Sequence, residues 1–486
     1  MVITKEICLA LNISTITSGQ SMTNPSLSNS HIHILGIAGT MTASLAVALK
    51  QAGARVTGSD QPKIFPPIST TLKKADIKIN ITDIDHDINQ AIIGSSYNLF
   101  ENTKEEFKQI KQQKIPYLSA TKYIAQNIIK PNSIIVAGSF GKTTITSLLA
   151  WIFHHTKLKP SYMFGGSSKN KFSPVKITDS NWSIVEGDES IHGLDKTAKF
   201  LYYPAKYLII TSADWEHKDS YPDAASNLKT FKKLVQKLPS DGVFLVNQQS
   251  PSALSLAQYS PAKVISYNTP ESDYFLEKTI PQKNFTTLII RTPSGIIKTN
   301  TTLIGQFNFE NILAAVALSD YLAISPKIIA KSIFSYRGIR RRLELVAKPK
   351  NILFFDDFAQ SGNRIKSTLT ALNSHYPQKK IKVLYQAHAS FSQYKSSLDE
   401  LKNAFNLADE IVLTQLKFNH NINKKNRNTA KDFRDCLGSK LIYLPLKTQI
   451  MQYYKHSLTS NDILIYMSSG GLEGNRIFKS VINLFK

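Results

Sequence analysis

The stretch at residues 137–144, A-G-S-F-G-K-T-T, constrains the fold of this chain more than any other. The apolar run 133–137 before it is typical of a buried strand, and residues 143–155 after it have the apolar spacing of a helix. The free N–H groups at the start of that helix and the charge of Lys142 favour a bound phosphate in the glycine turn between them. Without a ligand, the same pattern is a glycine-rich turn with an exposed lysine.

The turn is shorter than the general phosphate-loop pattern. G-x-x-x-x-G-K-[ST] places a glycine five residues before Gly141, where this chain has Val136. A nucleotide phosphate is still the ligand that we expect here, with the Thr143 hydroxyl placed to reach its Mg²⁺. The strand, turn and helix together predict an α/β domain.

Length and charge narrow the class of protein. A chain of 486 residues with 42% hydrophobic content is long enough for three domains of roughly 100–200 residues each. Its formal charge of +24, from 59 Lys and Arg against 35 Asp and Glu, suits a polyanionic partner. The basic residues are spread along the chain with only short local runs. This spread favours a phosphorylated substrate over a nucleic acid.

Two further features favour a cytoplasmic protein. The two cysteines, Cys8 and Cys436, cannot form a disulfide framework, which fits a reducing compartment. No apolar run approaches the ~18 residues needed to span a bilayer, so we expect no membrane insertion. Residues 1–30, rich in Ser, Thr and Asn from position 11 on, are predicted to form a flexible extension.

A first domain is predicted over residues 31–130. Residues 31–60 read as strand, glycine turn, helix and strand, the opening of a dinucleotide-type fold, with Asp60 closing the second strand. The turn contains Gly36 and Gly39 but has Ala38 in place of the second glycine of G-x-G-x-x-G. NAD, another anionic ligand such as a UDP-sugar diphosphate, and no ligand at all remain alternatives.

A second domain is predicted over residues 131–336. The strand at 182–186 ends in Glu186, Asp188 and Glu189, and the strand at 207–212 leads to Asp214, Glu216 and His217. Acidic strand ends beside a phosphate loop supply the hard oxygen ligands of a metal–phosphate site. The alternatives are a solvated acidic turn and a surface histidine.

The remainder of the second domain is predicted to contain strands at 243–247, 263–267 and 286–291 and around Leu303. A helix is predicted over 308–324. Asn308 and Asn311 lie one turn apart at its start, suited to capping or to the edge of a base.

A third domain is predicted over residues 337–486. It begins with three arginines, of which Arg342 is the last, followed by a strand at 351–355 that runs into Asp356 and Asp357. Guanidinium groups suit phosphate neutralisation, although a solvated basic turn is the alternative. Strands at 382–385, 410–414 and 462–467 complete another α/β alternation.

Six motifs in this order resemble those of the Mur ligase family, over essentially residues 31–486. They are G-S-F-G-K-T-T at 138–144, E-G-D-E-S at 186–190, A-D-W-E-H at 213–217, G-Q-F-N-F-E-N at 305–311, R-R-L-E at 341–344 and D-D-F-A at 356–359. The resemblance implies an α/β fold of three domains: a Rossmann-like UDP-binding domain, a central ATPase-like domain with the phosphate loop, and a Rossmann-like C-terminal domain.

The resemblance also implies an assignment of site residues. Those expected to be catalytic are Lys142, His217, Arg342 and Asp357. Those expected to bind ATP are Gly138, Ser139, Phe140, Gly141, Lys142, Thr143, Thr144, Asn308, Asn311, Arg342 and Asp357. Those expected to bind the UDP-sugar are Gly36, Ile37, Ala38, Gly39, Thr40, Met41 and Asp60. Mg²⁺ is expected on Thr143, Glu186 and His217.

Within the family, the start G-I-A-G-T-M is similar to that of members acting on UDP-N-acetylmuramic acid. The segments at 65–70, 194–204 and 467–471 look most like members that add the murein tripeptide L-alanyl-γ-D-glutamyl-meso-diaminopimelate; L-alanine is the alternative amine. The chemistry implied is phosphorylation of the lactyl carboxylate by ATP to an acyl phosphate, which the amine then attacks. No nucleic acid is expected as a partner, and the oligomeric state is left open.

Some positions depart from the family pattern. Phe307 stands where G-x-H-N has its histidine, and Gln360, Ser361 and Gly362 replace the H-H-P of D-D-[FY]-A-H-H-P. Ile191 occupies the position of an aspartate. Because of these departures, one alternative is a family member that binds nucleotide or UDP-sugar without ligating. Because of the basic charge, a nucleic-acid-dependent ATPase is another alternative.

Overall fold

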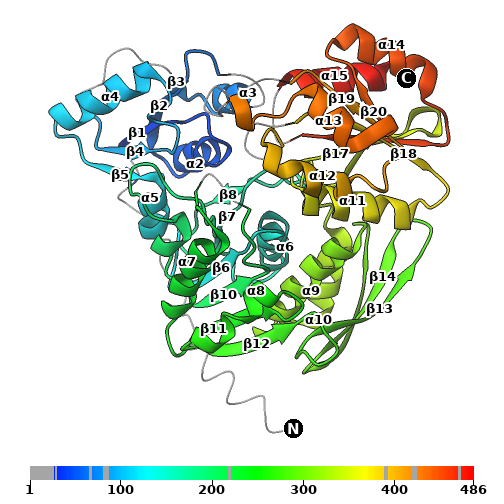
Figure 1. Ribbon diagram of the computed structural model, residues 1–486. Coiled ribbons are helices and arrows are strands. Elements are labelled where there is room, and N and C mark those ends of the chain that lie inside the picture. The colour runs from blue at the N-terminus through cyan, green and yellow to red at the C-terminus, as the bar shows by residue number, and fades with distance from the viewer. Residues whose placement is uncertain are drawn as a thin grey trace.

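The structure is a computed structural model that describes residues 27, 30–64, 68–79, 87–216, 220–387, 392–416, 424–468 and 472–486. It contains three α/β domains, each built on a largely parallel sheet, and one small antiparallel sheet. The N-terminal domain (blue) and the C-terminal domain (orange to red) are drawn above the central domain (green) in Figure 1. The predicted three-domain α/β architecture is confirmed. The predicted extension lies mostly outside the described residues.

The N-terminal domain has a five-stranded parallel sheet in the order β3-β2-β1-β4-β5. The strands are β1 (His31–Leu35), β2 (Arg55–Ser59), β3 (Lys78–Ile79), β4 (Gln90–Ile93) and β5 (Tyr117–Ser119), and the helices are α2 (Thr40–Gln51), α3 (Ile68–Lys74), α4 (Glu101–Gln112) and α5 (Ala120–Asn127). The order reverses at β1, so the crevice at its carboxyl end is the usual ligand position of such a sheet.

The central domain has a seven-stranded sheet in the order β12-β11-β10-β6-β9-β7-β8, parallel except for the β7–β8 pair. Its strands are β6 (Asn132–Ala137), β7 (Ser161–Met163), β8 (Val175–Lys176), β9 (Trp182–Glu186), β10 (Tyr207–Ile210), β11 (Val243–Asn247) and β12 (Lys263–Tyr267). Its helices are α6 (Lys142–His154), α7 (Ala224–Gln236), α8 (Pro251–Leu254), α9 (Gln306–Tyr321) and α10 (Pro326–Ser335). β6 lies between β10 and β9, which brings both acidic strand ends to the phosphate loop.

Alternation along β6 assigns each face of this sheet to a different core. Ile134 and Val136 pack against α6 and α9, in a cluster that also contains Leu148 and Ile312. Ile135 points to the opposite face, where a second cluster includes α7, the short 3-10 helix η1 (Lys199–Tyr202) and residues of the N-terminal domain. The N-terminal and central domains therefore share one buried apolar cluster.

The antiparallel sheet consists of β13 (Phe275–Pro281), β14 (Thr286–Thr292) and β15 (Gly295–Thr301). The prediction of a strand around Leu303 is wrong, because the strand ends at Thr301. The Leu303 N–H donates to the Thr301 hydroxyl over 3.1 Å, and the side chain packs on the α6–α9 cluster. The apolar run reflects loop packing rather than a sheet position.

The C-terminal domain has a six-stranded sheet in the order β16-β17-β21-β18-β19-β20, parallel except for β16–β17. Its strands are β16 (Glu344–Ala347), β17 (Leu353–Asp357), β18 (Lys380–Tyr385), β19 (Glu410–Leu413), β20 (Leu441–Tyr443) and β21 (Asp462–Met467), and its helices are α11 (Gly362–His375), α12 (Leu398–Ala404), α13 (Ala430–Leu437), α14 (Lys447–Ser457) and α15 (Leu472–Asn483). α11 and α12 cover one face of the sheet, and α14 and α15 cover the other. Among the described residues, no helix is both long and apolar enough to cross a bilayer.

Candidate active site

The phosphate loop joins β6 to α6 and has a backbone shape that needs glycine at two positions. Gly138 has φ +126° and Gly141, the N-cap of α6, has φ +78°. A Cβ at Gly141 would lie 2.2 Å from Asn311 Oδ1, and one at Gly138 would lie 2.1 Å from Thr211 Oγ1. The two glycines therefore allow β10 and α9 to approach the turn closely.

The loop is anchored to the end of β10. The Thr211 hydroxyl donates to the Phe140 carbonyl over 2.6 Å, and the Ser139 hydroxyl donates to the Asp214 carbonyl over 2.6 Å. The Ser139 N–H donates to the Ser212 carbonyl over 3.1 Å. These bonds fix the turn while leaving the N–H groups of the first turn of α6 pointing out of the helix.

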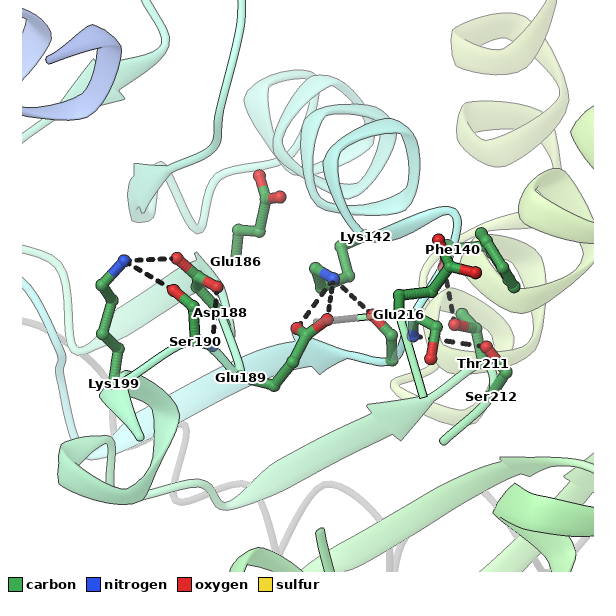
Figure 2. Close-up of polar contacts among 12 residues, drawn as sticks. Phe140, Lys142, Glu186, Asp188, Glu189, Ser190, Lys199, Thr211, Ser212 and Glu216 are labelled. Carbon is green, nitrogen blue, oxygen red and sulfur yellow. Dashed lines mark hydrogen bonds and ion pairs between the residues drawn. The ribbon is translucent and has the colours of Figure 1, made fainter. Parts of the chain in front are cut away.

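The Lys142 ammonium lies against the Glu189 carboxylate, 2.8 and 3.0 Å from its two oxygens (Figure 2). It also donates to the Gly138 carbonyl at the start of the loop. Glu189 is buried, so this ion pair is largely removed from water. The arrangement holds a full positive charge over the glycine turn, where a phosphate would lie.

Glu186 faces the first turn of α6. The Thr143 hydroxyl donates to Glu186 Oε1 over 2.8 Å, and the Gly165 N–H donates to Oε2 over 2.6 Å. Burial raises the pKa of Glu186, and the Gly165 N–H, Lys142 and Thr143 oppose that rise. A hydroxyl and a carboxylate in contact beside a phosphate loop are a donor set that fits Mg²⁺, which takes few protein ligands when phosphates supply the others.

The three carboxylates that the sequence groups together have different partners. Glu186 turns to Thr143, Glu189 to Lys142, and Asp188 to Lys199, whose ammonium lies 2.7 Å from Asp188 Oδ2 (Figure 2). Burial works against ionisation of Asp188, but the Lys199 charge and hydrogen bond hold its pKa well below the usual range. Asp188 therefore pairs with η1 rather than with the phosphate loop.

The structure places the two asparagines of α9 differently. Asn311 lies against Gly141 of the phosphate loop, as the close approach above shows. The Asn308 side-chain amide donates to the Ile304 carbonyl over 2.8 Å, which closes the start of the helix. Predicted His217 lies outside the described residues, whereas Glu216 just before it lies at the site. Thr144, the last predicted loop residue, is buried in α6.

A turn before β16 brings basic residues of the C-terminal domain to the site. Arg341 and Leu343 have φ +61° and +48°, an unfavourable region for side chains of this kind. The Arg341 N–H donates to the Glu344 carboxylate over 2.9 Å, and the Leu343 N–H donates to Asp357. The carboxylates thereby hold the strained turn that presents Arg342.

Arg342 and Asp357 interact electrostatically at this turn. Burial raises the pKa of Asp357 to about 6, while Arg342 and the N–H groups of Leu343 and Ala359 oppose the rise. Burial lowers the pKa of Arg342, and so does the positive charge of Arg364. Glu186 opposes that shift, so Arg342 is close enough to the metal-type carboxylate for their charges to interact.

The turn between β1 and α2 in the N-terminal domain contains the predicted UDP-sugar residues. The Ala38 N–H donates to Asp60 Oδ2 over 2.8 Å, so the carboxylate after β2 closes the turn. Gly36 has φ +76°, and the Thr42 hydroxyl donates to its carbonyl over 2.7 Å. Gly39 is the N-cap of α2, Thr40 begins the helix, and Ile37 and Met41 pack into the domain core.

Comparisons with known proteins identify the family of this chain. The sequence matches three family profiles: Mur ligase family, catalytic domain, at residues 31–130; Mur ligase middle domain at 136–319; and Mur ligase, glutamate ligase domain, at 341–470. The chain belongs to the Mur ligase family. It is therefore an ATP-dependent ligase that forms an amide bond.

Two curated relatives illustrate the range within the family. The UDP-N-acetylmuramate–L-alanine ligase of Pelagibacter ubique is 29% identical over 461 residues, covering 90% of this chain and 95% of the relative. The UDP-N-acetylmuramate–L-alanyl-γ-D-glutamyl-meso-2,6-diaminoheptandioate ligase of Haemophilus influenzae is 28% identical over 352 residues, covering 70% and 76%. The two differ in the amine that their names state.

Solved structures of both kinds share the fold. UDP-N-acetylmuramate–alanine ligase from Thermotoga maritima aligns with a TM-score of 0.75 at 20% identity, over 93% of this chain and 98% of that one. A murein peptide ligase from Psychrobacter arcticus aligns with a TM-score of 0.68 at 21% identity, over 94% and 99%. At these identities the likeness establishes the three-domain fold.

In this Mur ligase, Phe307 has a defined structural role. It stands where the family pattern has histidine, and it packs with Ile304 against the core of the C-terminal domain. The preceding Gly305 has φ +92°, and a Cβ there would lie 2.6 Å from Ala371 Cβ of α11. The departure therefore supplies an apolar contact between the central and C-terminal domains.

The Q-S-G departure lies at the start of α11. Ser361 is the buried N-cap, Gly362 is the first helical residue, and the Gln360 carbonyl accepts from the Ser392 hydroxyl over 3.3 Å. A Cβ at Gly362 would lie 2.3 Å from the Glu400 side chain, which would have to move to accommodate a larger residue. Ile191, the remaining departure, is partly exposed and pairs with the backbone of Ala198.

One residue of the Mur ligase site was missed by the sequence reasoning. Arg364, in the first turn of α11, donates to the Ser139 carbonyl of the phosphate loop over 3.1 Å. The available signal was a basic residue in the first turn of a helix, where the helix dipole disfavours positive charge. Nothing in its local sequence identifies the loop as its partner, because 225 residues separate the two.

Proposed function

We propose that this ligase uses ATP to join the lactyl carboxylate of UDP-N-acetylmuramic acid to the amine of L-Ala-γ-D-Glu-meso-diaminopimelate. The observation that carries the proposal is the convergence of Lys142, the Thr143–Glu186 pair and Arg342 around one glycine turn. Positive charge from two domains and a metal-type donor pair meet where a transferred phosphoryl group would lie. Such preorganised charge is the main catalytic device in phosphoryl transfer.

The reaction would proceed in two steps. A lactyl carboxylate oxygen attacks the γ-phosphorus of ATP, the bond to the β,γ-bridging oxygen breaks, and ADP leaves. The uncharged amine then attacks the carbonyl carbon of the acyl phosphate, loses a proton, and expels inorganic phosphate as the amide forms. Lys142 and the N–H groups of α6 stabilise the charge on the transferred phosphoryl group. Closure of the C-terminal domain keeps water away from the acyl phosphate.

Thr143 and Glu186 are the described residues that would hold Mg²⁺, with His217 as a further candidate. Mg²⁺ would supply positive charge to the β- and γ-phosphate oxygens of bound ATP. Among the described residues no group of three or more His, Cys, Asp and Glu side chains forms a metal site, which suits a cation bound mainly through nucleotide phosphates and water.

The tripeptide is favoured by the segment at residues 194–204. This segment contains η1 and is joined to the N-terminal domain by a Lys122–Asp195 ion pair of 2.9 Å. It resembles the tripeptide-adding members, as do residues 65–70 and 467–471, although 65–67 and 469–471 lie outside the described residues. L-alanine is the second candidate, supported by the stated amine of the Pelagibacter ubique relative.

Product mass distinguishes the candidates. The enzyme is given ATP, Mg²⁺ and UDP-N-acetylmuramic acid with either the tripeptide or L-alanine, and the products are identified by mass spectrometry. We expect the tripeptide adduct, together with ADP release that requires Mg²⁺, the UDP-sugar and the amine. An L-alanine adduct alone would replace the proposal with the second candidate, and ADP release indifferent to the amine would contradict both.

A further inference from the structure

Arg364 connects the C-terminal domain to three parts of the ATP site. Its guanidinium donates to the Ser139 carbonyl over 3.1 Å and lies over the Phe140 ring, 5.4 Å from the ring centre. Arg364 Nε also lies 3.9 Å from the Glu216 carboxylate, in the segment that follows β10. A planar guanidinium can make these contacts together, because it donates in its plane and stacks on its face.

The position of Arg364 combines these favourable contacts with two electrostatic repulsions. It lies in the first turn of α11, where the helix dipole favours negative charge. It also lies near enough to Arg342 for its charge to lower the pKa of that guanidinium. The side chain is only about a quarter exposed, so solvent does little to screen either repulsion. A nucleotide phosphate at the loop would add negative charge near this arginine and so reduce the repulsion.

α11 is fixed against the central domain at a second point. Ala371, seven residues after Arg364, lies where a Cβ on Gly305 would be 2.6 Å away. Phe307 packs on the same apolar cluster as Ile365 and Leu369 of α11. The helix therefore contacts the start of α9 with its apolar face and the phosphate loop with Arg364. Moving the C-terminal domain would displace both contacts together.

We propose that Arg364 is a positioning residue for phosphoryl transfer, which ties the shape of the phosphate loop to closure of the C-terminal domain. The loop is held from the central domain by Thr211, Ser212 and Asp214, and from the C-terminal domain by Arg364. The carbonyl of Ser139 and the ring of Phe140 transmit the contact to Gly141 and Lys142. The proposal rests on ATP binding at this loop, which is part of the proposed function.

The test compares Arg364→Ala and Arg364→Lys with Arg434→Ala, a control in which an exposed arginine on α13 of the same domain is removed. Loss of correct positioning at a reacting centre costs about 10²-fold in kcat, and we expect this loss for R364A. R364K should recover part of the lost activity. Lysine keeps the positive charge but lacks the planar guanidinium that donates in its plane and stacks on a ring. KM for UDP-N-acetylmuramic acid should stay within about twofold, as that site is in another domain.

A second readout separates positioning from a loss of fold. Hydrogen exchange of the peptide containing residues 138–141 is measured in the ADP complex, with a melting curve for each variant. R364A should speed exchange in this peptide while leaving the β1–α2 turn unchanged. Unchanged kcat or unchanged exchange in folded R364A would overturn the proposal. If R364A does not fold, the same two measurements are made on R364K. If the wild type forms no amide, the proposed function fails, and exchange alone decides the role of Arg364.

Discussion

Lys142 is the residue on which the ATP site depends most directly. Its ammonium has two carboxylate oxygens of Glu189 within 3.0 Å, which fixes the charge over the glycine turn. Removing it also takes from buried Glu189 the ammonium that lies against it, so the variant loses both a phosphate contact and local order. The residues around Gly36 that we propose to bind the UDP-sugar lie in a separate domain.

We therefore expect Lys142→Ala to abolish ATP-dependent ligation. The loss should be at least about 10²-fold in kcat, the typical cost of removing one preorganised charge from a transition state. UDP-N-acetylmuramic acid should bind with an unchanged Kd, measured by calorimetry. Lys229→Ala on the exposed side of α7 is the control and should behave as the wild type. Loss of both ATP turnover and UDP-sugar binding would mean that the two sites are misplaced.

Asp357 links the stability of the protein to pH. Burial raises the pKa of this carboxyl to about 6 from the 3.8 of an ordinary aspartate, so the native state binds the proton more tightly than the unfolded state between these values. The contribution of this group to stability is therefore largest below about pH 4 and is lost as pH rises through about 6. The full change is on the order of 3 kcal/mol.

The Asp357→Asn variant isolates this contribution. The free energy of unfolding in urea is measured for the wild type and the variant from pH 4.5 to pH 7.5, with a signal that reports on the C-terminal domain. The wild type should lose stability relative to the variant as pH rises, because asparagine does not titrate. A difference between the two proteins that stays constant over this range, or that changes in the opposite direction, would contradict the assigned pKa.

At the scale of elements, the contact between the start of α9 and α11 joins two domains. Phe307 contributes an apolar side chain to the C-terminal cluster, whereas Phe309, two residues later, packs against the central cluster. The two residues thus offer a matched pair: similar sequence position, the same chemistry, and different domains as partners.

Phe307→Ala should loosen the C-terminal domain from the central domain. Removing a partly buried aromatic side chain costs roughly 1–3 kcal/mol, here mostly from the contact between domains. Small-angle scattering of the nucleotide complex should show a larger radius of gyration for F307A than for the wild type, with lower kcat. F309A should instead lower the melting temperature with little change in radius. An equal radius for F307A and the wild type would show that this contact does not hold the domains together.

At the scale of the whole molecule, the charge of +24 does not require a nucleic-acid partner. Much of the positive charge near the site is committed to specific carboxylates, such as Lys142 to Glu189 and Lys199 to Asp188. Arg341 is likewise paired with Asp356, its Nε 3.3 Å from Oδ1. The remaining lysines are distributed over all three domains.

DNA or RNA added to the ligation assay should leave ADP release unchanged. Binding of polynucleotides to the basic surface is expected to be non-specific and to weaken steeply with salt. The measurement is the ADP release rate at two salt concentrations with and without each polymer. Stimulation that disappears at the higher salt would instead support a nucleic-acid-dependent ATPase.

The local chemistry of this protein can be predicted from short stretches of its sequence. Residues 133–137 and 462–467 were predicted as strands because continuous apolar runs between turn signals need no distant information, and the structure has β6 and β21 there. The sequence also identifies the phosphate-loop glycines, Lys142 and Thr143, because recognising this motif needs no information from distant parts of the chain. Their roles follow from a strand–turn–helix unit that the chain builds within about twenty residues.

The distant groups that meet at this unit could not be predicted in the same way. The division of Glu186, Asp188 and Glu189 among three partners, the contact of Phe307 with another domain, and the reach of Arg364 to the loop depend on how the domains pack. The apolar run at Leu303 was misassigned because loop packing and strand packing bury the same side chains. Local periodicity records burial, but it carries no information about the partner that buries each residue.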